Sequence, residues 1–266
     1  MEPTAIYMRV PVVPEKNCKI MGNMLSLERV VFPGHPNPGA KQELESQGFD
    51  VNTRGFAELH TTHKPVCNIA VAVYHGNMED FSEVAHLWQK LNARKLIGFE
   101  YPGYGWRIDS APPSQDSILR EVKKLAPVLG LQRTVVCGRS LGTFAAIHMA
   151  LELGSDSCAG LVLLSPMLTA VATKIMPPLH RALSFMDLID NESAVKQLSA
   201  RIPVLIVHGK NDMVVPVSNA RFLRTLLPSC HYLELDDIGH NDLSNSEFVW
   251  DRIRAFVSIC QSHPSQ

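Results

Sequence analysis

The feature that most constrains the fold is a short apolar run that leads into a serine flanked by glycines and then into a helical pattern. The residues are Thr134-Val-Val-Cys-Gly-Arg-Ser-Leu-Gly142, and apolar spacing continues to Ala150. They predict a buried strand over 134–137, a sharp turn, and a helix from Leu141. Glycine is needed at both ends of such a turn because a side chain would collide with the neighbouring strand or helix. The turn exposes the Ser140 hydroxyl near the positive end of the helix dipole, so Ser140 is the candidate nucleophile.

Apolar runs typical of strands alternate with amphipathic patterns typical of helices along most of the chain. The expected strands are 27–32, 55–62 (at an edge), 66–74, 95–101, 134–137, 159–165, 203–208 and 231–235. The expected helices are 80–91, 114–129, the one from 141, 217–227 and 245–259. This alternation predicts an α/β fold with a mostly parallel eight-stranded sheet and helices on both faces.

The domain organisation expected from these patterns is simple. Residues 1–25 are proline-containing and lack periodicity, which predicts an irregular N-terminal arm, and 26–266 form a single domain. Residues 168–200 are expected to be a short lid insertion, in which Leu179, Leu183 and Met186 follow helical spacing. This apolar stripe suits either packing onto the sheet or an adaptable surface for acyl chains.

Two residues later in the chain could activate Ser140. Serine is a poor nucleophile at neutral pH unless a base lies within hydrogen-bond reach and a carboxylate orients that base. Asp212 follows strand 203–208, and His240 follows strand 231–235. Taken singly, Asp212 could be a helix-capping carboxylate and His240 a surface histidine. Because nucleophile, acid and base come in this order, each in a loop at the carboxyl end of an expected strand, we interpret them as a Ser-His-Asp triad.

An oxyanion hole requires two preorganised amides. One is expected from Leu141, directly after the serine. The other is expected from the loop after strand 66–74, where Gly76 allows a tight turn. We predict the amide of Asn77, with Met78 as the second choice.

Five segments resemble a known family: His75-Gly-Asn77, Phe99-Glu-Tyr-Pro-Gly-Tyr-Gly105, Gly138-Arg-Ser-Leu-Gly142, His208-Gly-Lys-Asn-Asp212 and Gly239-His-Asn-Asp242. The chain resembles the serine hydrolases of α/β-hydrolase fold, close to the α/β-hydrolase domain-containing proteins, a group that includes protein depalmitoylases. The resemblance spans roughly residues 66–260 and implies the hydrolase fold and the triad. Two features differ: the family usually has Asp where Glu100 stands, and depalmitoylases have a cysteine-rich acylated N-terminus, whereas residues 1–25 hold only Cys18. The resemblance thus favours the fold and triad over a role in protein depalmitoylation.

Composition limits the possible partners. The net charge of −1 gives no reason to expect nucleic acid. Six scattered cysteines without a C-x-x-C pair suit a reducing compartment, and no signal peptide or membrane span is evident, so a cytoplasmic location is expected. His60 and His63 fall on opposite faces of a strand, and no phosphate-binding glycine loop is present, so we expect neither metal nor cofactor.

The sequence therefore predicts a serine hydrolase that cleaves a carboxylic ester or thioester through an acyl-enzyme. The substrate would be a small or lipid-like acyl compound, with acyl-lipid and acyl-protein both open. A small-peptide serine peptidase and a non-catalytic hydrolase fold that binds a ligand or protein are the alternatives.

Overall fold

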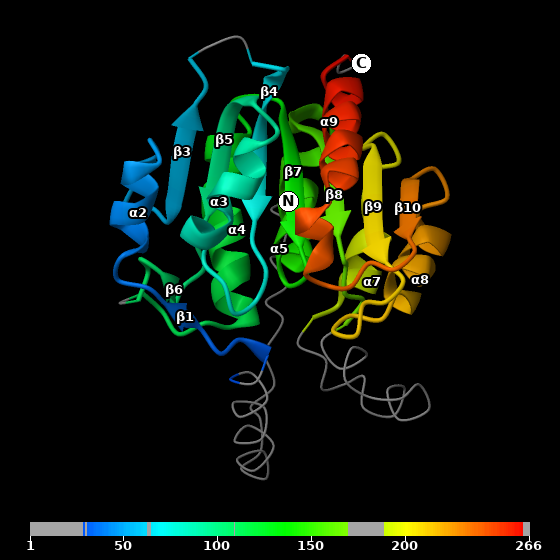
Figure 1. The fold of residues 1–266 in the computed structure, drawn as a ribbon, viewed down its shortest axis with the longest axis horizontal. Helices are drawn as coiled ribbons and strands as arrows, with labels where there is room; N and C mark the ends of the chain where they lie inside the picture. The colour runs from blue at the N-terminus through cyan, green and yellow to red at the C-terminus, as the bar shows by residue number, and fades with distance from the viewer. Residues whose placement is uncertain (1–28, 30, 63–64, 109, 170–188, 263–266) are drawn as a thin grey trace, which may run out of the picture.

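An eight-stranded sheet forms the centre of the computed structural model, which describes residues 29, 31–62, 65–108, 110–169 and 189–262 (Figure 1). The strand order is β10-β9-β8-β7-β4-β5-β3-β2. All neighbours from β10 to β5 are parallel, and β3 pairs antiparallel with β5 and with β2. The predicted mostly parallel eight-stranded sheet is confirmed. The strands of this sheet are β2 (Asp50–Val51), β3 (Phe56–His60), β4 (Cys67–Tyr74), β5 (Ala93–Phe99), β7 (Thr134–Arg139), β8 (Cys158–Leu164), β9 (Val204–Gly209) and β10 (His231–Leu235).

Helices cover both faces of the sheet, as the sequence predicts (Figure 1). One apolar cluster packs α4, α5, α7 and α8 against one face, and a second packs α2, α3 and α9 against the other. The helices are α2 (Ala40–Ser46), α3 (Phe81–Gln89), α4 (Gln115–Leu129), α5 (Gly142–Ser157), α7 (Asn191–Val195), α8 (Ser218–Leu226) and α9 (Glu247–Ser262), with a 3-10 helix, η3 (Asp242–Asn245).

The N-terminal part differs from its sequence prediction. Arg29 and Val31 are helical, so the strand expected over 27–32 is wrong for these residues. Short apolar runs fit a helical turn or a strand equally well. The strand at Phe56–His60 is not the edge, because the two-residue β2 lies outside it. Two further short strands, β1 (His35–Pro36) and β6 (Tyr104–Gly105), form a separate parallel pair.

The parallel order fixes where the candidate residues lie. Because β4, β7, β9 and β10 run in one direction, their carboxyl ends meet at one edge of the sheet, the lower edge in Figure 1. Asn77, Ser140, Asp212 and His240 all follow these ends. Ligands of open α/β sheets bind at this edge.

Most of the predicted lid lies outside the described residues, as do Leu179, Leu183 and Met186 and the N-terminal arm over 1–25. The described ends of the lid segment adjoin each other: Thr169 and Asp190 form an isolated antiparallel bridge, and the Asn191 amide donates to Leu168 O at 3.1 Å. The chain therefore returns at Asp190 to the point where it left the core.

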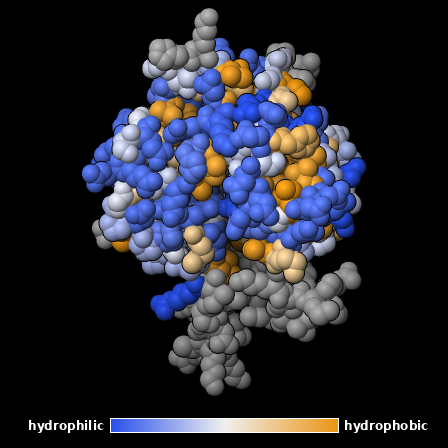
Figure 2. Space-filling model, in the orientation of Figure 1, coloured by the Kyte–Doolittle hydropathy of each residue, from blue (hydrophilic) through white to orange (hydrophobic). Residues whose placement is uncertain are grey.

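The molecular surface is mostly hydrophilic on the face drawn in Figure 2, where hydrophobic residues form small separate patches. In the part of the chain that the structure describes, no helix combines the length and apolarity needed to cross a bilayer.

We expect Gly142→Ala to destabilise the fold, since a Cβ there would lie 2.2 Å from Tyr74 O and 2.5 Å from His75 O. Overpacking against backbone costs about 1–3 kcal/mol or more. Urea unfolding measures the loss. Gly39→Ala is the matched control, because its nearest neighbour would be 3.5 Å away and its φ is −84°. Equal effects of the two substitutions would contradict the close approach.

Candidate active site

Ser140 occupies a strained turn between β7 and α5. Its φ is +51°, which is uncommon for a residue with a side chain. Its amide donates to Leu164 O at 2.9 Å, which anchors the turn to β8. A Cβ on Gly138 would lie 2.4 Å from Gly142 O, so the turn requires both glycines. Such strain persists only where surrounding structure enforces it, and it is concentrated at functional sites.

Asp212 and His240 are hydrogen-bonded to each other. Asp212 Oδ2 lies 2.7 Å from His240 Nδ1, and Asp212 Oδ1 accepts the amides of Val214 and Val215 at 2.9 and 2.8 Å. Because the carboxylate can only accept, Nδ1 carries the proton and leaves Nε2 of the neutral ring free to accept another. This tautomer is the one a general base needs.

A second histidine, His208, also contacts Asp212. Its Nε2 lies 2.8 Å from Val215 O and 3.3 Å from Asp212 Oδ2. Since a carbonyl only accepts, Nε2 of His208 is a donor and stabilises the charged carboxylate. Burial would raise the pKa of Asp212, but the bonds from His208, His240 and the Val215 amide hold it well below its usual range. In the sequence, His208 is the end of strand 203–208 and the first residue of the segment His208-Gly-Lys-Asn-Asp212, and neither feature indicates a contact with Asp212.

Ser140 and His240 line one open cavity of about 880 Å³ at the carboxyl edge of the sheet. Among the described residues, no hydrogen bond links Ser140 Oγ to the His240 ring. Catalytic hydrogen bonds are often long before substrate binds and shorten in the complex. The structure thus brings all three candidate residues to one site, with the acid–base contact already formed.

The two candidate oxyanion amides have no hydrogen-bond partner within the described residues, and both are held in fixed orientations. The Gly76 carbonyl belongs to the same peptide unit as the Asn77 amide, and it accepts from His75 Nδ1 at 2.8 Å. The Ser140 carbonyl, in the unit of the Leu141 amide, accepts Thr143 N at 3.0 Å and Thr143 Oγ1 at 2.6 Å. In a trans peptide the two groups point in opposite directions, so fixing the carbonyl also aims the amide.

The second-choice amide is already occupied. Met78 N donates to Asn77 Oδ1 at 3.1 Å. The remaining hydrogen bonds of the Asn77 side chain hold the loop in place. Its Nδ2 donates to Val31 O at 2.8 Å, and its Oδ1 accepts from the Tyr104 hydroxyl at 2.7 Å. The geometry favours Asn77 over Met78 as the amide that faces the cavity.

A buried pair, His75 and Glu100, lies behind this loop and was not recognised from the sequence. His75 Nε2 is 2.8 Å from Glu100 Oε1, and both side chains are fully buried. Glu100 Oε2 accepts the Phe81 amide at 3.2 Å, and a Cβ on Gly105 would lie 2.1 Å from Oε2. Gly105, without a side chain, thus provides the room for the glutamate at position 100.

The His75–Glu100 pair holds a shared proton. Burial lowers the pKa of His75, but Glu100 more than offsets this and the pKa is raised. Burial raises the pKa of Glu100, and its contacts with His75 offset only part of that rise. Since His75 Nδ1 already donates to Gly76 O, the shared proton lies between Nε2 and Oε1. It keeps the ring oriented toward the Gly76–Asn77 peptide.

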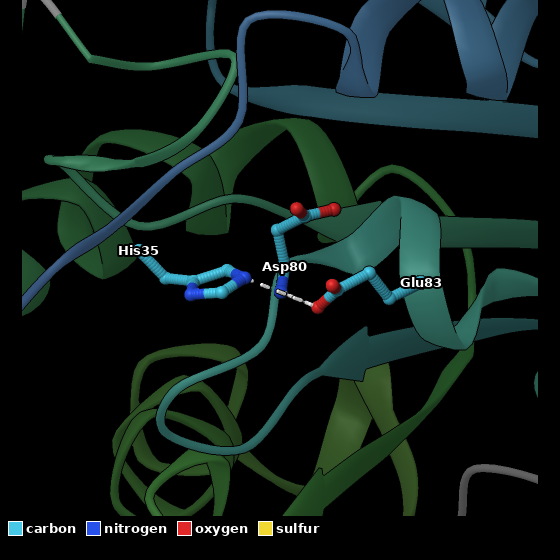
Figure 3. A group of neighbouring side chains, drawn as sticks. All are labelled: His35, Asp80 and Glu83. Carbon is cyan, nitrogen blue, oxygen red and sulfur yellow. Dashed lines mark hydrogen bonds and ion pairs between the residues drawn. The ribbon is translucent and has the colours of Figure 1, made fainter.

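One group of described residues has metal-ligand character: His35, Asp80 and Glu83 (Figure 3). Their atoms already have partners. Asp80 caps α3 through the amide and hydroxyl of Ser82 and accepts from Asn37, and Glu83 Oε2 accepts the Asp80 amide at 3.1 Å. His35 Nε2 lies 3.3 Å from the same oxygen. This is a capping box that holds β1 against α3, which accounts for the cluster without a metal ion.

We expect Glu100→Gln to fold nearly as stably as the wild type, because its amide can donate to His75 Nε2 while its oxygen accepts the Phe81 amide. Glu100→Leu leaves both groups unpaired, at a cost on the order of 1–3 kcal/mol each. Urea unfolding of the two variants tests this. Equal destabilisation by Gln and Leu would show that the hydrogen bonds do not matter.

Comparison with known proteins gives sequence relatives and structural neighbours, although no protein-family model matches the chain. α/β hydrolase domain-containing protein 17C of Xenopus tropicalis is 23% identical over 204 residues, 73% of this chain and 63% of that protein. The human protein 17B is 27% identical over 195 residues, 69% and 64% of the two chains. The chain thus spans less than two thirds of the length of these relatives.

The fold comparison agrees with the sequence comparison. Paleococcus ferrophilus monoacylglycerol lipase superposes with a TM-score of 0.55 at 21% identity, over 78% of this chain and 98% of that one. The strand order and the sharp turn at Ser140 point to the same fold as these similarities. The chain has the α/β-hydrolase fold, and in sequence it resembles the α/β hydrolase domain-containing proteins 17B and 17C.

Proposed function

We propose that the chain is a serine hydrolase that cleaves carboxylic esters or thioesters through an acyl-enzyme. The observation that carries this proposal is the 2.7 Å bond between Asp212 and His240, formed at the rim of the cavity that Ser140 also lines. A non-catalytic binding protein has no need for a strained serine in the same cavity as an imidazole of defined tautomer.

The proposed reaction has two acyl transfers. Ser140 Oγ attacks the substrate carbonyl while His240 Nε2 takes its proton, and Asp212 stabilises the resulting imidazolium. The amides of Asn77 and Leu141 stabilise the oxyanion. His240 then protonates the departing alcohol or thiol, which leaves an acyl-serine, and a water activated by the same histidine releases the acid.

The cavity walls suit an acyl substrate. Its apolar lining includes Pro33, Met78, Met167 and Val214. Met78 and Val214 are also more than half exposed. Thioether and branched side chains of this kind accommodate flexible hydrocarbon. The expectation that residues 168–200 contribute a lid remains part of this proposal, since 170–188 lie outside the described residues.

The nucleophile is tested with a fluorophosphonate probe. Wild type should be labelled and Ser140→Ala should not, with kcat lower on the order of 10⁶-fold if the triad acts as a unit. Ser244→Ala is the matched control because Ser244 lines the same cavity without lying in the elbow, so its labelling should persist. Folded wild type that takes no label, or a labelled Ser140→Ala, would refute the assignment.

The substrate class is tested with p-nitrophenyl esters from acetyl to palmitoyl. We expect kcat/KM to rise with chain length, by up to ~0.8 kcal/mol per buried methylene, until the apolar wall is covered. Met167→Gln should raise KM for long chains more than for acetate, whereas Leu131→Gln, at a surface position 86% exposed, should not.

A flat or falling series would leave a small-ester hydrolase. Matched acyl amides belong in the same assay, because faster amide than ester turnover would favour the small-peptide peptidase instead.

A further inference from the structure

Arg139, the residue between Gly138 and Ser140, connects three loops of the candidate site. Its Nη1 donates to both oxygens of Glu79 at 2.9 and 2.8 Å, and its Nη2 donates to Asn241 Oδ1 at 2.6 Å. Glu79 lies in the loop after β4, and Asn241 directly follows His240 in the loop after β10. One guanidinium from the turn at Ser140 thus contacts two loops. The loop after β4 carries the proposed oxyanion amide of Asn77 and is called the oxyanion loop, and the loop after β10 carries His240 and is called the histidine loop.

Glu79 connects Arg139 to the backbone of the oxyanion loop. Its Oε1 accepts the Gly76 amide at 2.5 Å. A Cβ on Gly76 would lie 2.7 Å from Oε1 and 3.0 Å from Arg139 Nη1, so only glycine allows this approach. The Gly76 carbonyl is held by His75 at the same time. Residue 76 is therefore fixed at both its amide and its carbonyl, directly before the proposed oxyanion amide of Asn77.

Asn241 connects Arg139 to the loop that carries His240, the proposed base. His240 is held on one side by Asp212, and the next residue is held on the other by Arg139. A shift of the backbone here would lengthen or break one of these two bonds. The distance from His240 to the elbow is thus set by the same guanidinium that sets the position of the oxyanion loop.

The guanidinium of Arg139 is largely committed to contacts within the chain. Its side chain is 11% exposed and that of Glu79 18%, and the two charges compensate each other. Both Nη atoms have partners, and Nε is buried with no partner within the described residues. The planar guanidinium donates hydrogen bonds to two acceptors in different directions. A lysine ammonium at the end of a flexible chain does not reproduce this geometry.

We propose that Arg139 is a positioning residue that fixes the spacing between the oxyanion amide and His240 through Glu79 and Asn241. This inference rests on the proposed hydrolase function. Loss of these Arg139 contacts should lower kcat, because misplacement of reacting groups by about 1 Å costs up to about 10²-fold in rate.

The cleanest test changes Asn241, which is exposed and leaves the Arg139–Glu79 pair intact. In Asn241→Leu, we expect kcat for p-nitrophenyl acetate to fall about 10–100-fold while KM stays within about twofold. Asn241→Asp keeps the acceptor and should retain most of kcat on the high-pH plateau. Its added negative charge should move the acidic limb of the pH profile upward, since a nearby anion favours the imidazolium of His240. Asn68→Leu, an exposed position at the opposite end of β4, should match the wild type.

Arg139→Lys provides the coupling test. If Arg139 acts through Asn241, the double variant Arg139→Lys/Asn241→Leu should be no slower than Arg139→Lys alone. Multiplying effects, or a kcat of Asn241→Leu within about twofold of wild type, would overturn the positioning role. Fluorophosphonate labelling distinguishes failure of the proposed hydrolase function from failure of the proposed role of Arg139. Wild type without label refutes the hydrolase. Labelled wild type with an unaffected Asn241→Leu refutes only the role of Arg139.

Discussion

The close contact between the start of α5 and the end of β4 is the constraint on which the rest of the site depends. A Cβ at Gly142 would lie 2.2 Å from Tyr74 O, so the helix can begin here only without a side chain. This contact brings the Ser140–Leu141 peptide beside the loop 75–77. Two amides from distant parts of the chain can then face one cavity. The helix dipole points there as well, because α5 begins at that contact.

Three buried or half-buried carboxylates fix the surrounding loops in the same way. Glu79 accepts the Gly76 amide and pairs with Arg139, and Glu100 accepts the Phe81 amide and pairs with His75. Asp212 follows this pattern, with two backbone amides on one oxygen and His240 on the other. Each carboxylate ties a loop backbone to a cationic or imidazole side chain. The loops therefore keep their positions through polar contacts and not through apolar packing alone.

The sequence predicts the sheet, most helices, and the loops that carry Ser140, Asp212 and His240, because strand alternation and turn chemistry are local signals. It does not predict the contacts that orient those loops. Glu100 is 25 positions from His75, and Arg139 is 102 from Asn241, so no spacing rule connects them. The two-residue strands are too short for periodicity, so the sequence does not predict β2 and instead predicts the edge at strand 55–62. Nothing in the sequence around His208 indicates its contact with Asp212, which only the tertiary structure shows.

The distribution of charge also limits how an oxyanion could be stabilised here. Arg139 is compensated by Glu79, and the shared proton of His75 and Glu100 leaves that pair without net charge. Neither of these two pairs therefore leaves an uncompensated charge beside the amides. In the proposed reaction, the developing charge would be met by the fixed dipoles of Asn77, Leu141 and the start of α5. Because their carbonyls are already hydrogen-bonded, these dipoles need little reorganisation, which is the property that makes such groups effective in a partly dry site.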